Sequence, residues 1–205
     1  MTRSLEGKQM NTTTVIIGEH GDKQAMAQAE HKEIICEDVN IPYSPLLSIK
    51  QNIHQLSILL DETDKTWLRE LVKTTALKGR GWTRPFRKDQ PGLLRLWGIL
   101  TALLTRPAKI LVLSPMVGMT AEDREAFKRL LVLCEERGID FRYTAERLQD
   151  VMRLDHPQRV YFAAGSDWLD TDTAALSVEL EAATPGTTWD DLQRRWEDGA
   201  NGQKS

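Results

Sequence analysis

Short, strongly apolar runs of β-forming residues alternate with helical segments along most of this chain, and this alternation limits the fold more than any other feature. Thr13–Ile17 is the first run and stops at a glycine turn, Ile34–Cys36 is the second, and Ile110–Leu113 is continuous and apolar. Strands that alternate with helices favour a parallel sheet with helices on its faces. We therefore expect an α/β fold.

The same alternation continues to about residue 165. Ile139, Phe141 and Tyr143 have the period-two spacing of a strand, and Val160–Ala163 is a last apolar run. Thr120 is placed to cap a helix, since Asp123 follows three residues later and Gly138 can end the helix. The other segments that favour helices are 22–30, 46–80, 93–104 and 146–154.

Bulk properties narrow the class of protein. The chain has 205 residues, enough for one sizeable domain, and its net charge of -3 gives no reason to expect nucleic-acid binding. The densest basic cluster, Arg80–Lys88, suits a solvated helix end or partner-facing loop, with phosphates or lipid headgroups as the alternative. No apolar run is long enough to span a bilayer, and the first residues do not resemble a signal peptide. We expect a cytoplasmic protein.

The composition changes near Ser166, where acidic residues begin to outnumber basic ones. We expect polar residues 1–12 to be disordered, 13–165 to form the domain, and 166–205 to form an acidic extension with a short helix. Thr188 and Asp191 resemble a capping box, and Trp189, Leu192 and Trp196 share one face of the helix that follows. This helix packs either on its own domain or in the groove of a partner.

Four groups of residues in register share a family pattern: Pro45–Ile53, Gly92 with Ala102–Pro107, Ile110–Pro115 with Val117–Gly118, and Glu136–Leu154. Together they resemble the second half of an ABC transporter nucleotide-binding domain, a member of the P-loop NTPase superfamily. The resemblance implies a helical subdomain over about 46–90. Because only about a dozen polar residues precede Thr13, we expect the N-terminal β part of that fold to be reduced. The sequence of Pro115–Gly118 resembles that of the ATPases of MCE/Mla-type lipid transporters.

The resemblance places a degenerate P-loop at residues 18–25. A P-loop cradles phosphates with backbone N–H groups, neutralises them with a lysine and holds magnesium with a hydroxyl. Without a gap, Lys23 replaces the second motif glycine and Gln24 the lysine; a one-residue gap returns Lys23 to the lysine position. In either alignment no Ser or Thr follows. Gly18, Gly21, Lys23 and Gln24 are the candidate nucleotide-binding residues.

The other positions that carry chemistry in the family are also altered. Both Walker B carboxylates, which hold magnesium and polarise water, are absent, so the resemblance implies no catalytic or metal-binding residue. Only one glycine of the signature motif remains. The altered positions are Val39 near the Q-loop, Gly92 in the signature motif, Leu113 and Ser114 in Walker B, Thr120 in the D-loop and Ala145 at the switch histidine.

Together these features predict a pseudo-ATPase: a non-catalytic, ABC ATPase-like subunit with a structural or regulatory role. The partner that the resemblance implies is an ABC permease or another ABC ATPase subunit, in a homo- or heterodimer, with the membrane reached only through that partner at its inner face. We expect no cofactor. One alternative is a divergent ATP-binding protein that still holds ATP through Lys23, and another is a stand-alone regulatory module.

Overall fold

A six-stranded sheet forms the centre of the protein in the computed structural model, which describes residues 13–17, 34–36, 43–79, 82–85, 90–164 and 167–202. The strand order is β2-β3-β4-β1-β5-β6, in which the first five strands are parallel and β6 runs antiparallel to β5. The strands are β1 Thr14–Ile17, β2 Ile34–Cys36, β3 Lys109–Val112, β4 Asp140–Ala145, β5 Arg159–Ala164 and β6 Asp167–Asp172.

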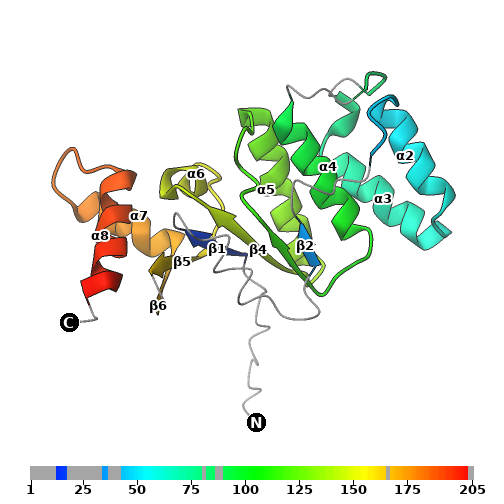
Figure 1. Ribbon diagram of the computed structural model, residues 1–205. Helices are drawn as coiled ribbons and strands as arrows, with labels where there is room; N and C mark the ends of the chain where they lie inside the picture. The colour runs from blue at the N-terminus through cyan, green and yellow to red at the C-terminus, as the bar shows by residue number, and fades with distance from the viewer. Residues whose placement is uncertain are drawn as a thin grey trace, which may run out of the picture.

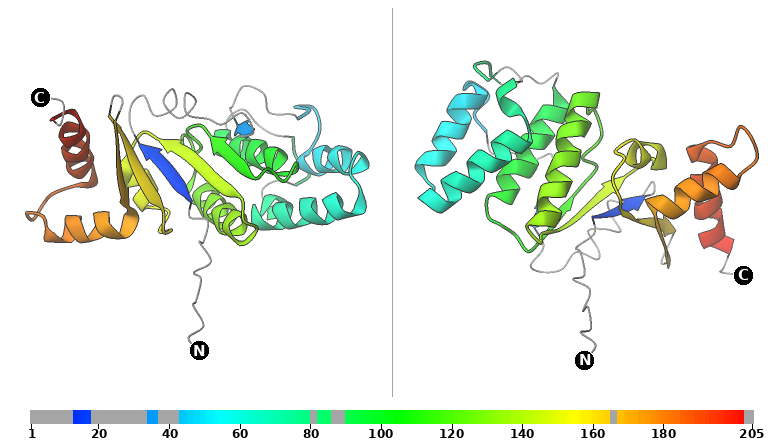
Figure 2. Two further views of the ribbon diagram at one scale, coloured as in Figure 1. Left: turned by 90° about the horizontal axis from the view of Figure 1, so that it is seen from below. Right: turned by 180° about the vertical axis from the view of Figure 1, so that it is seen from behind.

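Helices lie on the sheet and at both of its ends. Figures 1 and 2 show α2 and α3 at one end of the molecule, α7 and α8 at the other, and the sheet with α4 and α5 between them. The helices are α2 Ile49–Ile58, α3 Glu62–Thr74, the 3₁₀ turn η2 Leu77–Gly79, α4 Pro91–Leu103, α5 Ala121–Glu136, α6 Leu148–Met152, α7 Thr173–Ala182 and α8 Trp189–Gly202. The α/β class and the helical subdomain predicted from the sequence are confirmed.

The side chains of β1 point alternately to the two faces of the sheet, and both faces are buried at this strand. Val15 and Ile17 pack into the main core, whereas Ile16 contacts Leu111 on the other face, where Tyr161 covers the pair. Successive side chains of a strand point to opposite faces, so a short apolar run can serve two layers.

The capping signals in the sequence form as predicted. Thr120 and Asp123 make a complete capping box at the start of α5, and Gly138 adopts a positive φ of 70° just after the helix. The predicted helix over 46–80 is two helices and a 3₁₀ turn, because Asp61 caps α3 and starts a new helix after Leu60. The helix expected over 22–30 lies outside the described residues.

The C-terminal helix α8 packs on its own sheet. The Trp196 ring stacks on Phe162 with centroids 5.4 Å apart, and Leu192 is fully buried. Gln193 bonds to α6, accepting from the Leu148 N–H at 2.8 Å and donating to the Glu146 carbonyl at 2.9 Å. Strand β6 and helix α7, which join this helix to the sheet, were not predicted. The domain boundary that we expect near residue 166 stays a prediction.

A buried thiol offers a probe of the core. Burial raises the pKa of Cys134 to about 12, so the reactive thiolate is scarce while the protein is folded. In a Cys36→Ser variant we expect Cys134 to resist Ellman's reagent at pH 8 and to react fully in denaturant. Stoichiometric reaction of the folded variant on the time scale of the denatured one contradicts this packing.

Among the described residues, none of the helices combines the length and the apolar character needed to cross a membrane.

Candidate functional site

The carboxyl ends of parallel strands are where open α/β sheets bind ligands. In this protein β3 and β4 are neighbours that end at Val112 and Ala145, and Ser114, just after β3, meets Thr144 near the end of β4. Ser114 has a positive φ of 45°, which turns the chain sharply after β3. Its N–H donates to the buried Thr144 Oγ1 at 2.7 Å, and its carbonyl accepts from Arg95 Nη1 at 2.5 Å. The backbone of Ser114 is thus held on both sides by side chains of the protein itself.

Arg95 brings a positive charge from α4 to this edge. It is partly buried and interrupts an otherwise apolar helix face, since its neighbours Leu93, Leu96 and Trp97 are in the core. The bond to the Ser114 carbonyl satisfies an oxygen beyond the end of the β3 ladder, and a charged donor makes such a bond stronger than a neutral one.

The start of α4 lies directly against the start of α5. A Cβ atom added to Gly92 would stand 2.5 Å from Asp123 Oδ2 and 2.9 Å from Met119 Cα, so only glycine fits here. Pro91, at the first position of α4, lies against Gly118, which has a φ of 74°. The segment after β3 and the first turn of α4 are therefore closely packed.

The described part of the edge encloses a hollow of about 170 Å³, lined by residues that include Ser114, Thr144, Glu146 and Asp150. This is below the roughly 300–1,000 Å³ of most small-molecule sites. The described residues include no group of three or more His, Cys, Asp or Glu side chains placed to hold a metal ion.

Solved structures of ATP-binding cassettes share this architecture. CbiO1 from Clostridium perfringens, part of the ABC transporter complex cbiONQ, matches with a TM-score of 0.64 at 15% identity, over 84% of this chain and 81% of its own. An ATP-binding subunit of an ABC transporter matches with 0.62 at 12% identity, over 90% and 88%. A nucleotide-free ATP-binding cassette matches with 0.59 at 15% identity, over 85% of each chain. The protein has the ABC ATP-binding cassette fold.

No protein-family model matches the sequence, and no curated protein matches it. The structural matches, at their low identities, establish the cassette fold alone. The similarity of Pro115–Gly118 to MCE/Mla-type ATPases is untested by them.

The structure brings together most of the positions that the resemblance singled out. Leu113, Ser114 and Ala145 lie at the ends of β3 and β4, and Gly92 and Thr120 lie at the neighbouring starts of α4 and α5. The candidate nucleotide-binding residues Gly18, Gly21, Lys23 and Gln24, together with Val39, fall outside the described residues.

Magnesium is the ion that a working cassette binds with its nucleotide, and the described residues do not fit it. Mg²⁺ takes oxygen ligands in an octahedral shell and is usually bound through carboxylates. The Leu113 side chain offers no ligand atom, and the carbonyl oxygen of Ser114 is bonded to the Arg95 guanidinium. A cation at this carbonyl would meet the positive charge of Arg95 at contact distance.

Two important residues of this fold carried no functional signal in the sequence. In the sequence, Arg95 is only an interruption of the apolar run 93–104. Asn52 is buried, accepts from the Ser44 N–H at 2.7 Å, and donates to the carbonyls of Ser44, Leu47 and Ser48, each at 3.1 Å. It fastens the loop before α2, where Ser48 forms a capping box with Gln51. An asparagine one turn after a capping serine is the signal that could have identified it.

Proposed function

We propose that this protein is a non-catalytic subunit with the cassette fold, acting as a structural or regulatory partner of a membrane transporter or of a competent ATPase. The single observation that carries the proposal is the Arg95–Ser114 bond at the end of β3. A side-chain cation of the protein stands there, and the two positions assigned to the Walker B carboxylates hold Leu113 and Ser114.

The residues retained from the cassette pattern support the same view, because each has a structural task. Asn52 and Ser48 fold the loop before α2, and Gly92 allows α4 to approach α5. The altered D-loop position also has a structural task, because Thr120 caps α5 through Asp123. The chain retains what the fold needs and has lost what hydrolysis needs.

Exposed apolar side chains on the helical subdomain support a partner role. Leu46 is 87% exposed just before α2, and Ile58 and Leu59 are 67% and 86% exposed at its end. Single exposed hydrophobic residues such as Leu46 are common, but the adjacent pair Ile58 and Leu59 favours a protein contact at the end of α2. A membrane permease or a second ATPase subunit is the partner class we propose.

Calorimetry tests this proposal directly. Titration of MgATP into the purified protein at millimolar concentration is expected to give no binding heat, and thermal unfolding is expected not to shift. The physical reason is that the end of β3 has no carboxylate for the metal and presents Arg95 instead.

The outcome that contradicts the proposal is specific. It is binding at millimolar MgATP that is lost in Lys23→Ala and kept in Lys50→Ala, an exposed lysine on α2 that serves as the matched control. That result would instead establish a divergent ATP-binding protein.

A further inference from the structure

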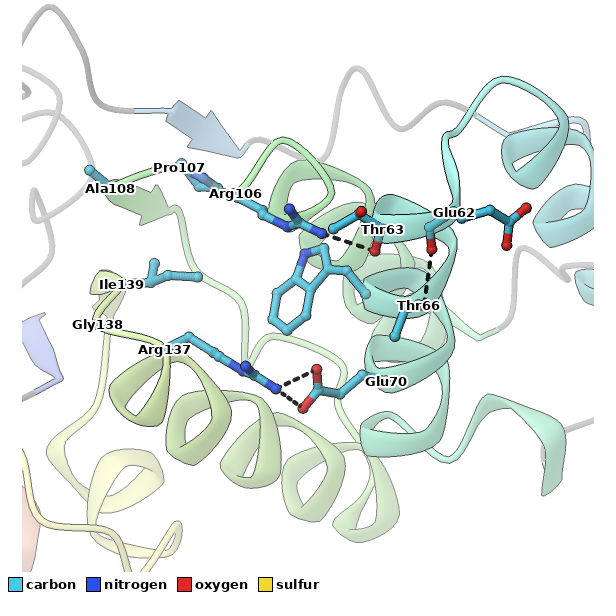
Figure 3. Close-up of a pocket in the computed structure, with 11 residues that line it drawn as sticks. Glu62, Thr63, Thr66, Glu70, Arg106, Pro107, Ala108, Arg137, Gly138 and Ile139 are labelled. Atoms are coloured by element: carbon cyan, nitrogen blue, oxygen red, sulfur yellow. Dashed lines mark hydrogen bonds and ion pairs between the residues drawn. The ribbon is translucent and has the colours of Figure 1, made fainter.

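A groove separates α3 from the loops that precede β3 and β4. It lies at the amino ends of these two strands, whereas the candidate site lies at their carboxyl ends. Its volume is about 850 Å³, and Trp67 is one of the residues that line it; Figure 3 shows the lining side chains. The loop Arg106–Ala108 and the segment Arg137–Ile139 form one wall, and α3 forms the other. The groove marks the seam between the helical subdomain and the sheet.

Two arginines cross this seam from the sheet side to α3. Arg106 Nη2 donates to the Thr63 carbonyl at 3.0 Å and lies 3.2 Å from Asp64 Oδ1. Arg137 Nη2 donates to both carboxylate oxygens of Glu70, at 2.6 and 2.8 Å. Figure 3 shows both arginines pointing toward α3, Arg106 at Thr63 and Arg137 at Glu70.

Two further bonds cross the same seam. Trp67 Nε1 donates to the Leu103 carbonyl at 2.8 Å in the interior, and Arg129 Nε on α5 donates to the Thr74 carbonyl at 2.9 Å. Arg137 also lies over the Trp67 ring, 5.7 Å from its centroid. The bonds are therefore distributed along the whole length of α3, from Thr63 to Thr74.

Their distribution determines what they do together. One exposed ion pair contributes little to stability, but rotation of α3 as a unit would have to break bonds at both of its ends and at its middle at once. We infer that these four ties lock the helical subdomain in one orientation relative to the sheet, whether or not nucleotide is present. The inference goes beyond the proposed function and does not rest on it.

Pulsed electron paramagnetic resonance on the full chain tests the lock. Nitroxide labels are placed at Gln55→Cys on α2 and Val132→Cys on α5, both exposed, in a Cys36→Ser background where buried Cys134 does not label. We expect one narrow distance peak, unchanged by MgATP. In Arg106→Ala/Arg137→Ala we expect that narrow peak to be lost, with the circular dichroism spectrum unchanged.

The matched control removes two arginines whose ion pairs lie within single helical segments. Arg153→Ala/Arg194→Ala loses the pairs with Asp150 and Asp191 and should keep the narrow peak. A charge exchange guards against a folding defect: in an Arg106→Ala background, Glu70→Arg should lose the peak, and Glu70→Arg/Arg137→Glu should regain it. A broad distribution in the parent overturns the lock alone, whereas a shift of the peak by MgATP overturns both the lock and the proposed function.

Discussion

Replacement of Trp67 by alanine is expected to lower the free energy of unfolding by about 3–5 kcal/mol, the usual cost of removing a large buried aromatic side chain. Trp67 is 6% exposed and contributes to the main core, and its indole N–H satisfies the Leu103 carbonyl. The substitution leaves a cavity at the seam and removes one of two hydrogen bonds to the Leu103 carbonyl, which still accepts from the Arg106 N–H at 3.0 Å. Urea unfolding followed by circular dichroism measures the change.

Trp67→Phe separates the two contributions. A smaller ring replaces the indole and the bond to Leu103 is lost, while the Arg106 N–H still satisfies that carbonyl, so we expect a smaller cost of about 0.5–1.5 kcal/mol. If Trp67→Ala costs less than about 1 kcal/mol, the indole does not occupy the buried position described, because surface substitutions alone have effects that small.

Gly92→Ala is expected to cost about 2–4 kcal/mol, through overpacking and the loss of a helix cap. The added methyl group would overlap Asp123 Oδ2 and the backbone of Met119. Asp123 cannot move aside without giving up its bonds to Thr120 at the start of α5. The measurement is again the midpoint and slope of urea unfolding.

Gly79→Ala is the matched control for this substitution. A Cβ atom at Gly79 meets nothing within 4 Å, so its effect should be neutral or stabilising by up to about 1 kcal/mol. Equal effects at the two glycines would show that close packing at Gly92 is not what requires glycine there.

Local patterns in the sequence predicted most of the sheet and the helices. The run Ile110–Leu113 gave β3, and Thr120 with Asp123 gave the start of α5, because short-range chemistry decides both. Strand β6 was missed. It carries Asp167, Asp170 and Asp172, residues that strands seldom contain, and it forms because β5 offers an antiparallel edge. Pairing with β5 therefore outweighs the low strand preference of the aspartates in β6.

The candidate site likewise has one part that could be predicted from the sequence and one part that could not. The absence of carboxylates at Leu113 and Ser114 is a matter of residue identity and can be read from the sequence. The bond from Arg95 to Ser114 joins α4 to the end of β3, and the four bonds of Asn52 depend on how a loop folds back. The spacing of Asn52 after the capping Ser48 could have indicated its role, but no spacing rule predicts the partner of Arg95, which is set by tertiary packing.

The position of β1 between β4 and β5 has a consequence for biosynthesis. Thr13, just before this first strand, bonds to Glu135, 122 residues later, and both strand neighbours of β1 come after Glu135 in the chain. During synthesis on the ribosome, the apolar run of β1 cannot pair with β4 or β5 until most of the polypeptide has been made. Such non-local pairing slows folding and leaves an aggregation-prone segment exposed in the nascent chain. A chaperone that shields β1 during translation would therefore raise the yield of folded protein.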